Sequence, residues 1–354
     1  MPRVVPPVLF GLLFVCGCQS TRYQAGLYNP SWEVQYEDTT SLFVGLSIVD
    51  ATTVWVSGSP GVVGRTTDGG ETWTMLDAPG PDSLQFRDVH AFSDQEAFIL
   101  SIGPGEDSRI YHTADGGASW TLSFQNEDPN AFFDCFSFWD NQRGFAFSDS
   151  HDGEFTLIRT MDGGATWQRI DPALVPDARD SEGSFAASGT CVETQLGGLG
   201  WFGTGASSVD TRVIRTADYG ESWTEAITPI ESTAGDEGIT TVLFWDGQNG
   251  IAFGSPSTRE TENVAITSDG GATWRSTGAT VLGGQVYGAS MVPGVLRPTL
   301  VAVSPSGSAF SADNGTTWTT FDGFEYWTTA FYSPTVGWAA GRGRISRMVS
   351  RSND

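Results

Sequence analysis

The sequence predicts an all-β protein, a seven-bladed β-propeller, and three observations support this prediction. An eight-residue pattern, Thr/Ser-x-Asp-x-Gly-x-Thr/Ser-Trp, occurs six times in the 354 residues. Strand-like segments surround the copies, and no amphipathic helical stretch stands out. The 44 glycines suit a chain with many turns. A repeat with a period of this length indicates a solenoid, a propeller or an array, so we expect one repeated domain.

Each copy of the pattern is predicted to form a tight hairpin turn. Its aspartate can accept hydrogen bonds from the backbone N–H groups of its own turn. The following glycine takes the positive φ that such a turn needs. The closing tryptophan opens the next strand and is expected to wedge between neighbouring sheets. The six aspartates are Asp68, Asp115, Asp162, Asp218, Asp269 and Asp313.

The segments around the pattern predict four short strands in every period. Residues that precede a copy are β-branched or apolar, as in 62–65, 157–159, 213–215 and 264–266. A strand, a turn and a strand are predicted further upstream, as in 138–147, 244–253 and 331–341. Four strands per unit, arranged radially, make up the blade of a propeller.

The two ends of the chain are predicted to close the ring. Residues 326–348 supply three more strands without a copy of the pattern, whereas 31–35 resemble a lone strand that follows a copy. We therefore expect the N-terminal strand to complete the last blade, which gives seven blades and removes exposed sheet edges. The propeller is expected to span 31–348, with a short tail at 349–354.

The beginning of the chain is typical of an exported lipoprotein. Met1-Pro2-Arg3 is weakly basic, and the apolar run of 8–15 is too short to span a bilayer. Cys18 follows Gly17 as the modified cysteine of a bacterial lipobox does. We expect a signal peptide at 1–18, lipidation of Cys18, a tether at 19–30 and a location in the bacterial envelope, with Gln19 favouring the outer membrane. An uncleaved apolar start is the alternative.

Two further cysteines, Cys135 and Cys191, fall in strands that are predicted to be innermost in consecutive blades. An oxidising envelope permits a disulfide between them. Inner strands of adjacent blades can, however, lie too far apart for such a bond. Two buried free thiols are therefore the expected state.

The charge of the chain excludes one class of partner. The formal net charge is −24, and all 18 basic residues are arginine. A surface this acidic repels phosphate backbones, so nucleic acid is not expected to bind. Solubility in a salty habitat or a coding bias explains the acidity most simply. An acidic groove for a basic partner or for cations is the alternative.

The repeats resemble the Asp-box, or bacterial neuraminidase repeat. The 47-residue period and Gly337-Trp338-Ala339-Ala340-Gly341 are more specifically similar to the seven-bladed propellers of photosystem II assembly and stability factors. The stretch 185–191, Phe-Ala-Ala-Ser-Gly-Thr-Cys, is similar to bacterial relatives that are described as oxidoreductase-like or glycosyl-hydrolase-like. The resemblance covers 31–348. It implies that the six aspartates are structural and lie opposite the binding mouth. It leaves the function open, because a shared fold hosts many functions.

Binding residues are expected on the loops of the other face, since sites sit on loops that a rigid frame positions. The long connector of 171–184 is a candidate to fold over this mouth. The candidate binding residues are Arg87, Asp88, Asp134, Glu182, Glu237, Arg259, Tyr287 and Tyr326.

Two kinds of function remain open on this evidence. A sialidase-like hydrolase would use Tyr287, Glu237, Asp88 and Arg87, but several arginines precede the repeats on outer strands, and the typical Arg-Ile-Pro tripeptide is missing. No dinucleotide-binding motif or paired metal-ligand spacing is present.

A calcium ion at Asp149, Asp152 and Glu154 is only weakly indicated. We therefore expect a non-catalytic, monomeric binding or assembly platform without a cofactor. Its expected partner is an envelope protein or a glycan, and the membrane is contacted only through the lipid. The alternative is a glycoside hydrolase or a carbohydrate-binding propeller.

Overall fold

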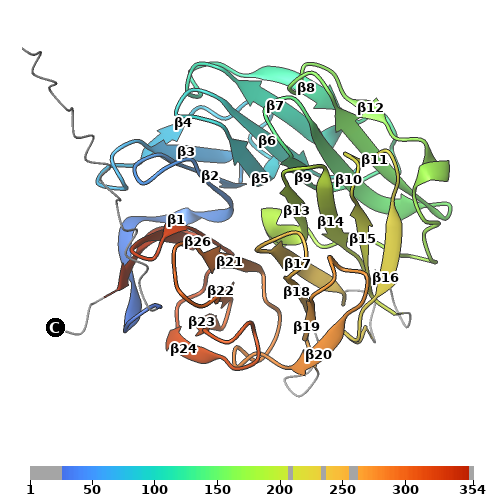
Figure 1. Cartoon of the computed structure of the whole chain (residues 1–354). Helices are drawn as coiled ribbons and strands as arrows, with labels where there is room; N and C mark the ends of the chain where they lie inside the picture. The colour runs from blue at the N-terminus through green and yellow to red at the C-terminus, as the bar shows by residue number, and fades with distance from the viewer. Residues whose placement is uncertain (1–25, 206–209, 233–236, 255–261, 351–354) are drawn as a thin grey trace, which may run out of the picture.

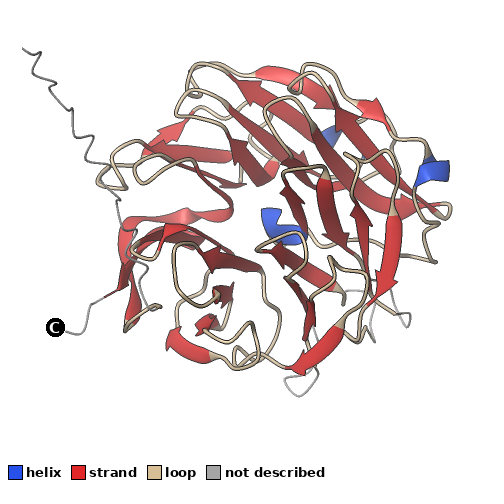
Figure 2. Ribbon diagram, in the orientation of Figure 1, coloured by secondary structure: helices blue, strands red, loops and turns tan. Residues whose placement is uncertain are grey.

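The computed structural model describes residues 26–205, 210–232, 237–254 and 262–350. Their sheets are arranged as a ring around a central axis, with the two ends of the described chain on the same side of the ring (Figure 1). Only short 3-10 helices interrupt the strands, and one of them lies in the middle of the ring (Figure 2). The protein is an all-β propeller. Cys18 and Arg259 lie outside the described residues.

Five of the sheets contain four antiparallel strands each. The first two are β5 (Gln85–Ala91), β6 (Ala97–Ile102), β7 (Arg109–Thr113) with β8 (Thr121–Gln125), and β9 (Phe133–Phe138), β10 (Gly144–His151), β11 (Glu154–Thr160) with β12 (Gln168–Arg169). The third and fourth are β13 (Val192–Gln195), β14 (Leu199–Gly203), β15 (Arg212–Thr216) with β16 (Thr224–Ile227), and β17 (Ile239–Phe244), β18 (Gly250–Gly254), β19 (Val264–Thr267) with β20 (Arg275–Gly278). The fifth is β21 (Gly288–Val292), β22 (Thr299–Ser304), β23 (Gly307–Ser311) with β24 (Thr319–Asp322).

The sixth sheet has six strands, in the order β25, β26, β1, β2, β3, β4. These are β25 (Thr328–Ser333), β26 (Val336–Ser350), β1 (Pro30–Ile48), β2 (Val54–Ser59), β3 (Val62–Thr66) and β4 (Thr74–Leu76). The predicted count of seven separate blades is therefore wrong, because the structure has six sheets. The physical reason is the length of β1 and β26, at 19 and 15 residues. They run through two units that the repeats had predicted to be separate.

The N-terminal strand joins the C-terminal strands, as the sequence predicted. Trp32 in β1 lies opposite Met348 in β26, whereas Leu46 further along β1 pairs with Val56 in β2. The indole Nε1 of Trp32 donates to Oγ of Ser308 at 2.9 Å. The buried ring also contacts aromatic side chains of this sheet. The two ends of the chain thus cover each other's sheet edges.

The repeated turns are held by their own side chains. Oδ1 of Asp68 accepts hydrogen bonds from the backbone N–H of Thr72 at 2.9 Å and from the hydroxyl of Thr66 at 2.7 Å. The hydrogen bonds from Thr72 lower the pKa of Asp68 to about 2. The glycines after it have φ of 75° and 86°, in the left-handed region. The same bonds recur in the other five copies, so these carboxylates are engaged within their turns.

The tryptophans of the repeats pack between sheets to different depths. Trp223 is 6% exposed, and its ring lies 5.0 Å from Phe145 in β10 and 5.5 Å from Phe202 in β14. It therefore contacts two neighbouring sheets at once. Trp167 contacts Phe138 at 5.8 Å but is only partly buried.

Replacing Trp223 by alanine is expected to lower the free energy of unfolding by about 3–5 kcal/mol, because a buried aromatic ring leaves a cavity between two sheets. Trp167→Ala should have a clearly smaller effect. Urea unfolding measures both, with Leu196→Ala as the control because that side chain is 83% exposed. Equal losses for the two tryptophans would contradict this account of the packing.

Candidate functional site

Two cavities near the axis are lined by described residues of the innermost strands and the loops next to them. One, the mouth cavity, has a volume of about 380 Å³ and is lined by β5, β9, β17, the ends of β6 and β10, residues 184–187 and the loops before β9, β21 and β25. The other, the opposite cavity, has a volume of about 250 Å³. Residues 184–187 line the mouth cavity, whereas Gly189 and Thr190 line the opposite cavity. We call residues 184–191 the strap, since this segment lies between the two cavities.

The strap is fixed to several sheets. The backbone N–H of Ser184 donates to Oδ1 of Asp149 at 2.8 Å, and the hydroxyl of Ser188 donates to the carbonyl of Tyr287 at 2.6 Å. A Cβ at Gly189 would overlap the carboxylate of Asp88, so only glycine fits there. The end of the strap is the 3-10 helix η3 (Gly189–Cys191), which lies in the middle of the ring (Figure 2).

Cys135 and Cys191 form a disulfide, with 6.3 Å between their Cα atoms. The expectation of two free thiols is therefore wrong. Cys191 belongs to η3 and not to an inner strand, so the chain steps toward β9 and brings the two sulfurs together. The connector of 171–184 reaches the mouth cavity only at its last residue. It is the strap that lies between the two cavities.

An aromatic and cationic cluster forms one part of the mouth cavity. The rings of Tyr287 and Trp327 lie 4.4 Å apart, and the guanidinium of Arg87 lies 5.6 Å from the Trp327 ring centroid. Arg87 donates to the carbonyl of Ala186 at 3.2 Å and to Oε1 of Gln85 at 3.1 Å, while its buried Nε has no acceptor among the described residues. This nitrogen remains available to a ligand that enters the cavity.

A pair of carboxyl groups, Asp134 and Asp149, forms another part of the mouth cavity. Asp134 is 2% exposed. Burial, and then the neighbouring Asp149, raise the pKa of Asp134 well above its usual range, and burial raises the pKa of Asp149. Each of two adjacent carboxyl groups disfavours the ionised form of the other, which adds to the cost of desolvation. Oδ2 of Asp134 receives no hydrogen bond from any other described side chain or backbone donor.

The opposite cavity contains three titratable side chains among hydroxyl groups. Burial raises the pKa of Asp88 to about 7, even though the carboxylate accepts from the backbone N–H groups of Val89 and Phe136. Burial also raises the pKa of Glu193 to about 8 and lowers the pKa of His90 to about 4. At neutral pH, Glu193 is therefore mostly protonated and His90 is neutral.

The predicted binding residues divide among different places. Arg87, Asp134 and Tyr287 line the mouth cavity together, whereas Asp88 faces the opposite cavity. Glu237 is buried, at 3% exposed, and is not among the described residues that line either cavity.

Tyr326 is a core residue and not a binding residue. Its side chain is fully buried, and its hydroxyl hydrogen-bonds Oγ of Ser346 at 2.8 Å. The next residue, Trp327, lines the mouth in its place. Sequence reasoning missed Trp327, although its position directly after Tyr326 was a usable signal because neighbouring residues point in different directions.

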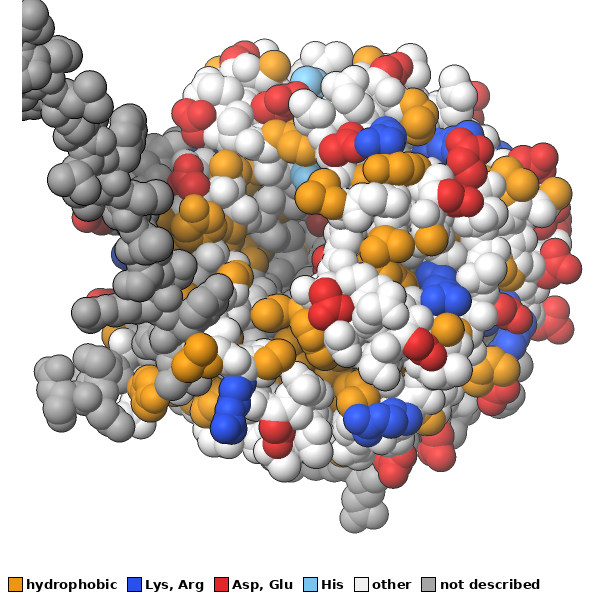
Figure 3. Space-filling model, in the orientation of Figure 1, with side chains coloured by type: hydrophobic (Ala, Val, Ile, Leu, Met, Phe, Trp, Pro, Cys, Tyr) orange, Lys and Arg blue, Asp and Glu red, His pale blue; other side chains and the backbone are white. Residues whose placement is uncertain are grey.

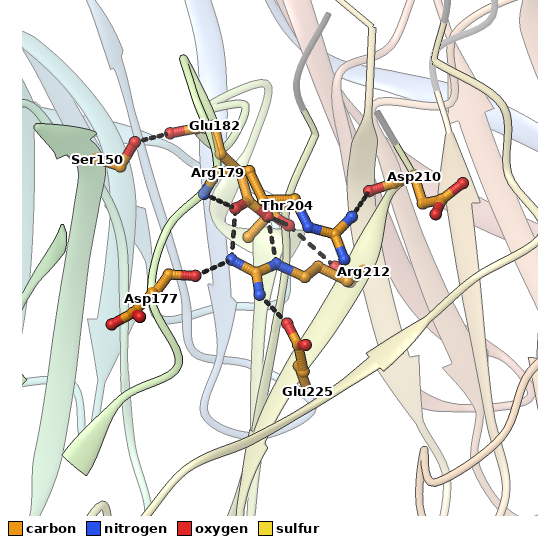
Figure 4. Close-up of polar contacts among 8 residues, drawn as sticks. All are labelled: Ser150, Asp177, Arg179, Glu182, Thr204, Asp210, Arg212 and Glu225. Atoms are coloured by element: carbon orange, nitrogen blue, oxygen red, sulfur yellow. Dashed lines mark hydrogen bonds and ion pairs between the residues drawn. The ribbon is translucent and has the colours of Figure 1, made fainter. Parts of the chain in front are cut away.

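Glu182 is likewise structural. Its carboxylate accepts from Nε of Arg212 at 2.7 Å and from the backbone N–H of Arg179 at 2.9 Å, and it accepts from the hydroxyl of Thr204 (Figure 4). The side chains of Glu182 and Arg212 are 1% and 2% exposed. The prediction that Glu182 binds a partner is therefore wrong, because this ion pair fixes the connector to β15.

The residues nominated for hydrolysis do not converge. Arg87 and Tyr287 lie in the mouth, Asp88 lies in the opposite cavity, and Glu237 lines neither in the part of the chain described. Burial, and then Glu325, raise the pKa of Tyr287, which makes its hydroxyl a poorer nucleophile.

The carboxylates nominated for calcium also separate. Asp152 contacts His151 at 3.3 Å and Glu154 contacts Arg169 at 3.3 Å, whereas Asp149 pairs with Asp134. Within the described ranges, no group of three or more His, Cys, Asp or Glu side chains is arranged to hold a metal ion. No helix in these ranges is both long and apolar enough to cross a bilayer.

The space-filling view shows a hollow at the centre of this face of the ring, and acidic side chains spread over much of the rim (Figure 3). Basic side chains are scattered singly or in twos and do not form a continuous patch. The fold and these cavities together define the protein as a β-propeller whose axial cavities are lined by charged, hydroxyl, aromatic and aliphatic side chains.

The family model described as photosynthesis system II assembly factor YCF48 matches residues 25–131. The structure titled "YCF48 bound to D1 peptide" is similar at a TM-score of 0.64 and 18% identity, and the match covers 95% of this chain and 100% of that one. YCF48 from Cyanidioschyzon merolae is similar at a TM-score of 0.60 and 16% identity, with coverages of 90% and 98%.

A streptogramin B lyase structure is similar at a TM-score of 0.64 and 11% identity, with coverages of 91% and 98%. No curated protein sequence matches the chain. Similarity at these identities establishes the fold alone, because binding proteins and a lyase share it.

Glu193 is expected to make stability depend on pH. Between pH 4.5 and about 8, this carboxyl group is protonated in the folded state and ionised in the unfolded state. Its contribution to the free energy of unfolding therefore falls as the pH rises through this range. Over this range the difference in unfolding free energy between Glu193→Gln and the wild type should grow by up to about 1.4 kcal/mol per pH unit. Urea unfolding from pH 5 to 8 measures it. The exposed Glu71→Gln variant is the control. If the free energy of unfolding changes with pH by the same amount in the wild type and in Glu193→Gln, the raised pKa of Glu193 is contradicted.

Proposed function

We propose that the protein is a non-catalytic platform that binds a polypeptide segment of a partner protein in the mouth cavity. The observation that carries this proposal is the combination of stacked aromatic rings and a partly satisfied guanidinium in one cavity. Tyr287 and Trp327 offer flat apolar surface, and Nε of Arg87 offers a donor to a backbone carbonyl or a carboxylate. Such anchors are typical of the residues that dominate binding energy in protein interfaces.

The comparisons support a polypeptide ligand more than a sugar. One similar propeller is YCF48 bound to the D1 peptide, and the matching family model is that of an assembly factor. A cavity of about 380 Å³ accommodates a few side chains, so the rest of the partner would extend over the surrounding loops.

Binding of peptides selected from a random library against the full protein tests the proposal. Trp327→Ala is expected to weaken the selected peptides at least tenfold, because a central aromatic anchor is lost. Fluorescence anisotropy measures the affinities. Tyr332→Ala is the matched control, since Tyr332 is 48% exposed and does not line the mouth cavity. Failure to select any peptide, or unchanged binding by Trp327→Ala, would overturn the platform. So would hydrolysis of an aryl sialoside that Tyr287→Phe abolishes.

We further propose that the protein is exported, anchored in the bacterial envelope through a lipid on Cys18, and monomeric there. The basic start, the apolar run and the lipobox-like sequence support the anchor. The disulfide between Cys135 and Cys191 supports an oxidising compartment, since such bonds are rare where thiols are kept reduced.

Labelling with an alkyne analogue of palmitate in a bacterial host tests the anchor. The wild type should carry the label and Cys18→Ala should lose it, because the thioether to the lipid forms at that cysteine. Cys16→Ala is the control and should keep the label. Label that persists in Cys18→Ala would refute the proposed site.

A further inference from the structure

We propose that Asp134 and Asp149 form a cation subsite of the mouth cavity, which receives the ammonium or guanidinium of a lysine or arginine side chain from the bound polypeptide. This inference rests on the proposed function and specifies which residue the partner presents. We call the two aspartates the acid pair.

The geometry of the acid pair leaves one atom unsatisfied. Asp149 accepts from the backbone N–H of Ser184 at 2.8 Å, which uses one of its oxygens. Asp134 accepts hydrogen bonds from the backbone N–H groups of Ala186 and Asp149, but no donor of the described residues is paired with its buried Oδ2, and the residue lines the cavity. A buried carboxylate oxygen without a donor is unfavourable, so a ligand donor that reaches it gains binding energy.

No positive charge within the described protein neutralises the acid pair. None of the ion pairs formed there includes Asp134 or Asp149. Arg87 lines the same cavity but is directed to Ala186, Gln85 and the Trp327 ring. An ionised carboxylate of the pair therefore has no cationic partner among the described residues.

The walls around the acid pair make a cation the favoured ligand. Ile102, Phe132 and Phe185 line the same cavity, and they lower the local dielectric so that a charge pair is stronger than in water. Aromatic rings also attract cations and the alkyl stems of lysine and arginine. An anion would be repelled by the pair, and the net charge of −24 attracts basic segments from a distance.

Two peptides that differ only in the charge of one side chain test the subsite. A peptide selected for the mouth is made with lysine and with norleucine at the same position. The lysine form is expected to bind the full protein at least tenfold more tightly, because a charge-assisted hydrogen bond replaces an apolar contact. Isothermal titration calorimetry measures both affinities.

The double variant Asp134→Asn, Asp149→Asn is expected to remove this preference, because it keeps the shape of the pair and deletes its charge. The double variant Asp152→Asn, Asp180→Asn is the matched control. It changes the net charge equally at exposed positions and should retain the preference. Circular dichroism and melting temperature show whether each variant is folded. If the acid-pair variant is unfolded, Asp134→Glu replaces it, since a longer carboxylate should alter the preference without removing the charge.

The outcomes separate this inference from the proposed function. Peptides that bind and are weakened by Trp327→Ala, but show equal affinity for lysine and norleucine, would overturn the cation subsite alone. A lysine preference that survives in the acid-pair variant would also overturn it. Binding of n-butylammonium, measured directly, decides the subsite even if no peptide binds. Saturable binding that the acid-pair variant loses supports it, and absence of such binding refutes it.

Discussion

The pairing of β1 with β26 is the constraint on which the rest of the structure depends. A propeller is stable only when its first and last strands meet, because an open ring would leave two long edges unpaired. Here the closure is made by residues from the two ends of the described chain, with Trp32 opposite Met348 and its indole hydrogen-bonded to Ser308. The same strand continues to Ile48 and pairs with β2. Closure therefore fixes the place of every inner strand, and hence the shape of the two cavities.

Much of this architecture was accessible from the sequence, because it repeats. Each turn carries its own aspartate and glycines, so a local signal specifies a local structure, and six copies reinforce one another. The strands before the turns, such as Val62–Thr66 and Arg212–Thr216, lie where the pattern predicted. The number of sheets could not be predicted from the repeats. Whether β1 passes between two units as one continuous strand depends on backbone register at the closure, which side-chain patterns do not specify.

The site was less predictable than the fold, because it depends on contacts that do not repeat. Tyr326 and Trp327 are adjacent aromatic residues, and only the direction of each side chain decides that the first is core and the second lines the mouth. Glu182 has the sequence context of an exposed loop carboxylate. Its partner Arg212 lies 30 residues further along the chain, and local sequence does not predict this ion pair. The strap and its disulfide could not be predicted for a related reason. The sequence around Cys191 predicts an inner strand, but Gly189–Cys191 forms the 3-10 helix η3 instead.

Ionisable groups inside proteins are usually paired with a group of opposite charge. Several carboxyl groups near the axis of this propeller have no such partner among the described residues. Asp134 is buried, whereas Asp149 and Glu193 are partly buried, and none of the three has a cationic partner among the described residues. Desolvation raises the pKa of each carboxyl group. Apolar side chains would fill the same space with greater stability. Natural sequences tolerate such conflicts mainly at functional sites. The conflict lies along the axis of the ring, on both sides of the strap, whereas the spaces between sheets are filled with aromatic and aliphatic side chains. Under the proposed function, the stability of the packed sheets supports unpaired carboxyl groups near the axis, which donors of a partner would satisfy.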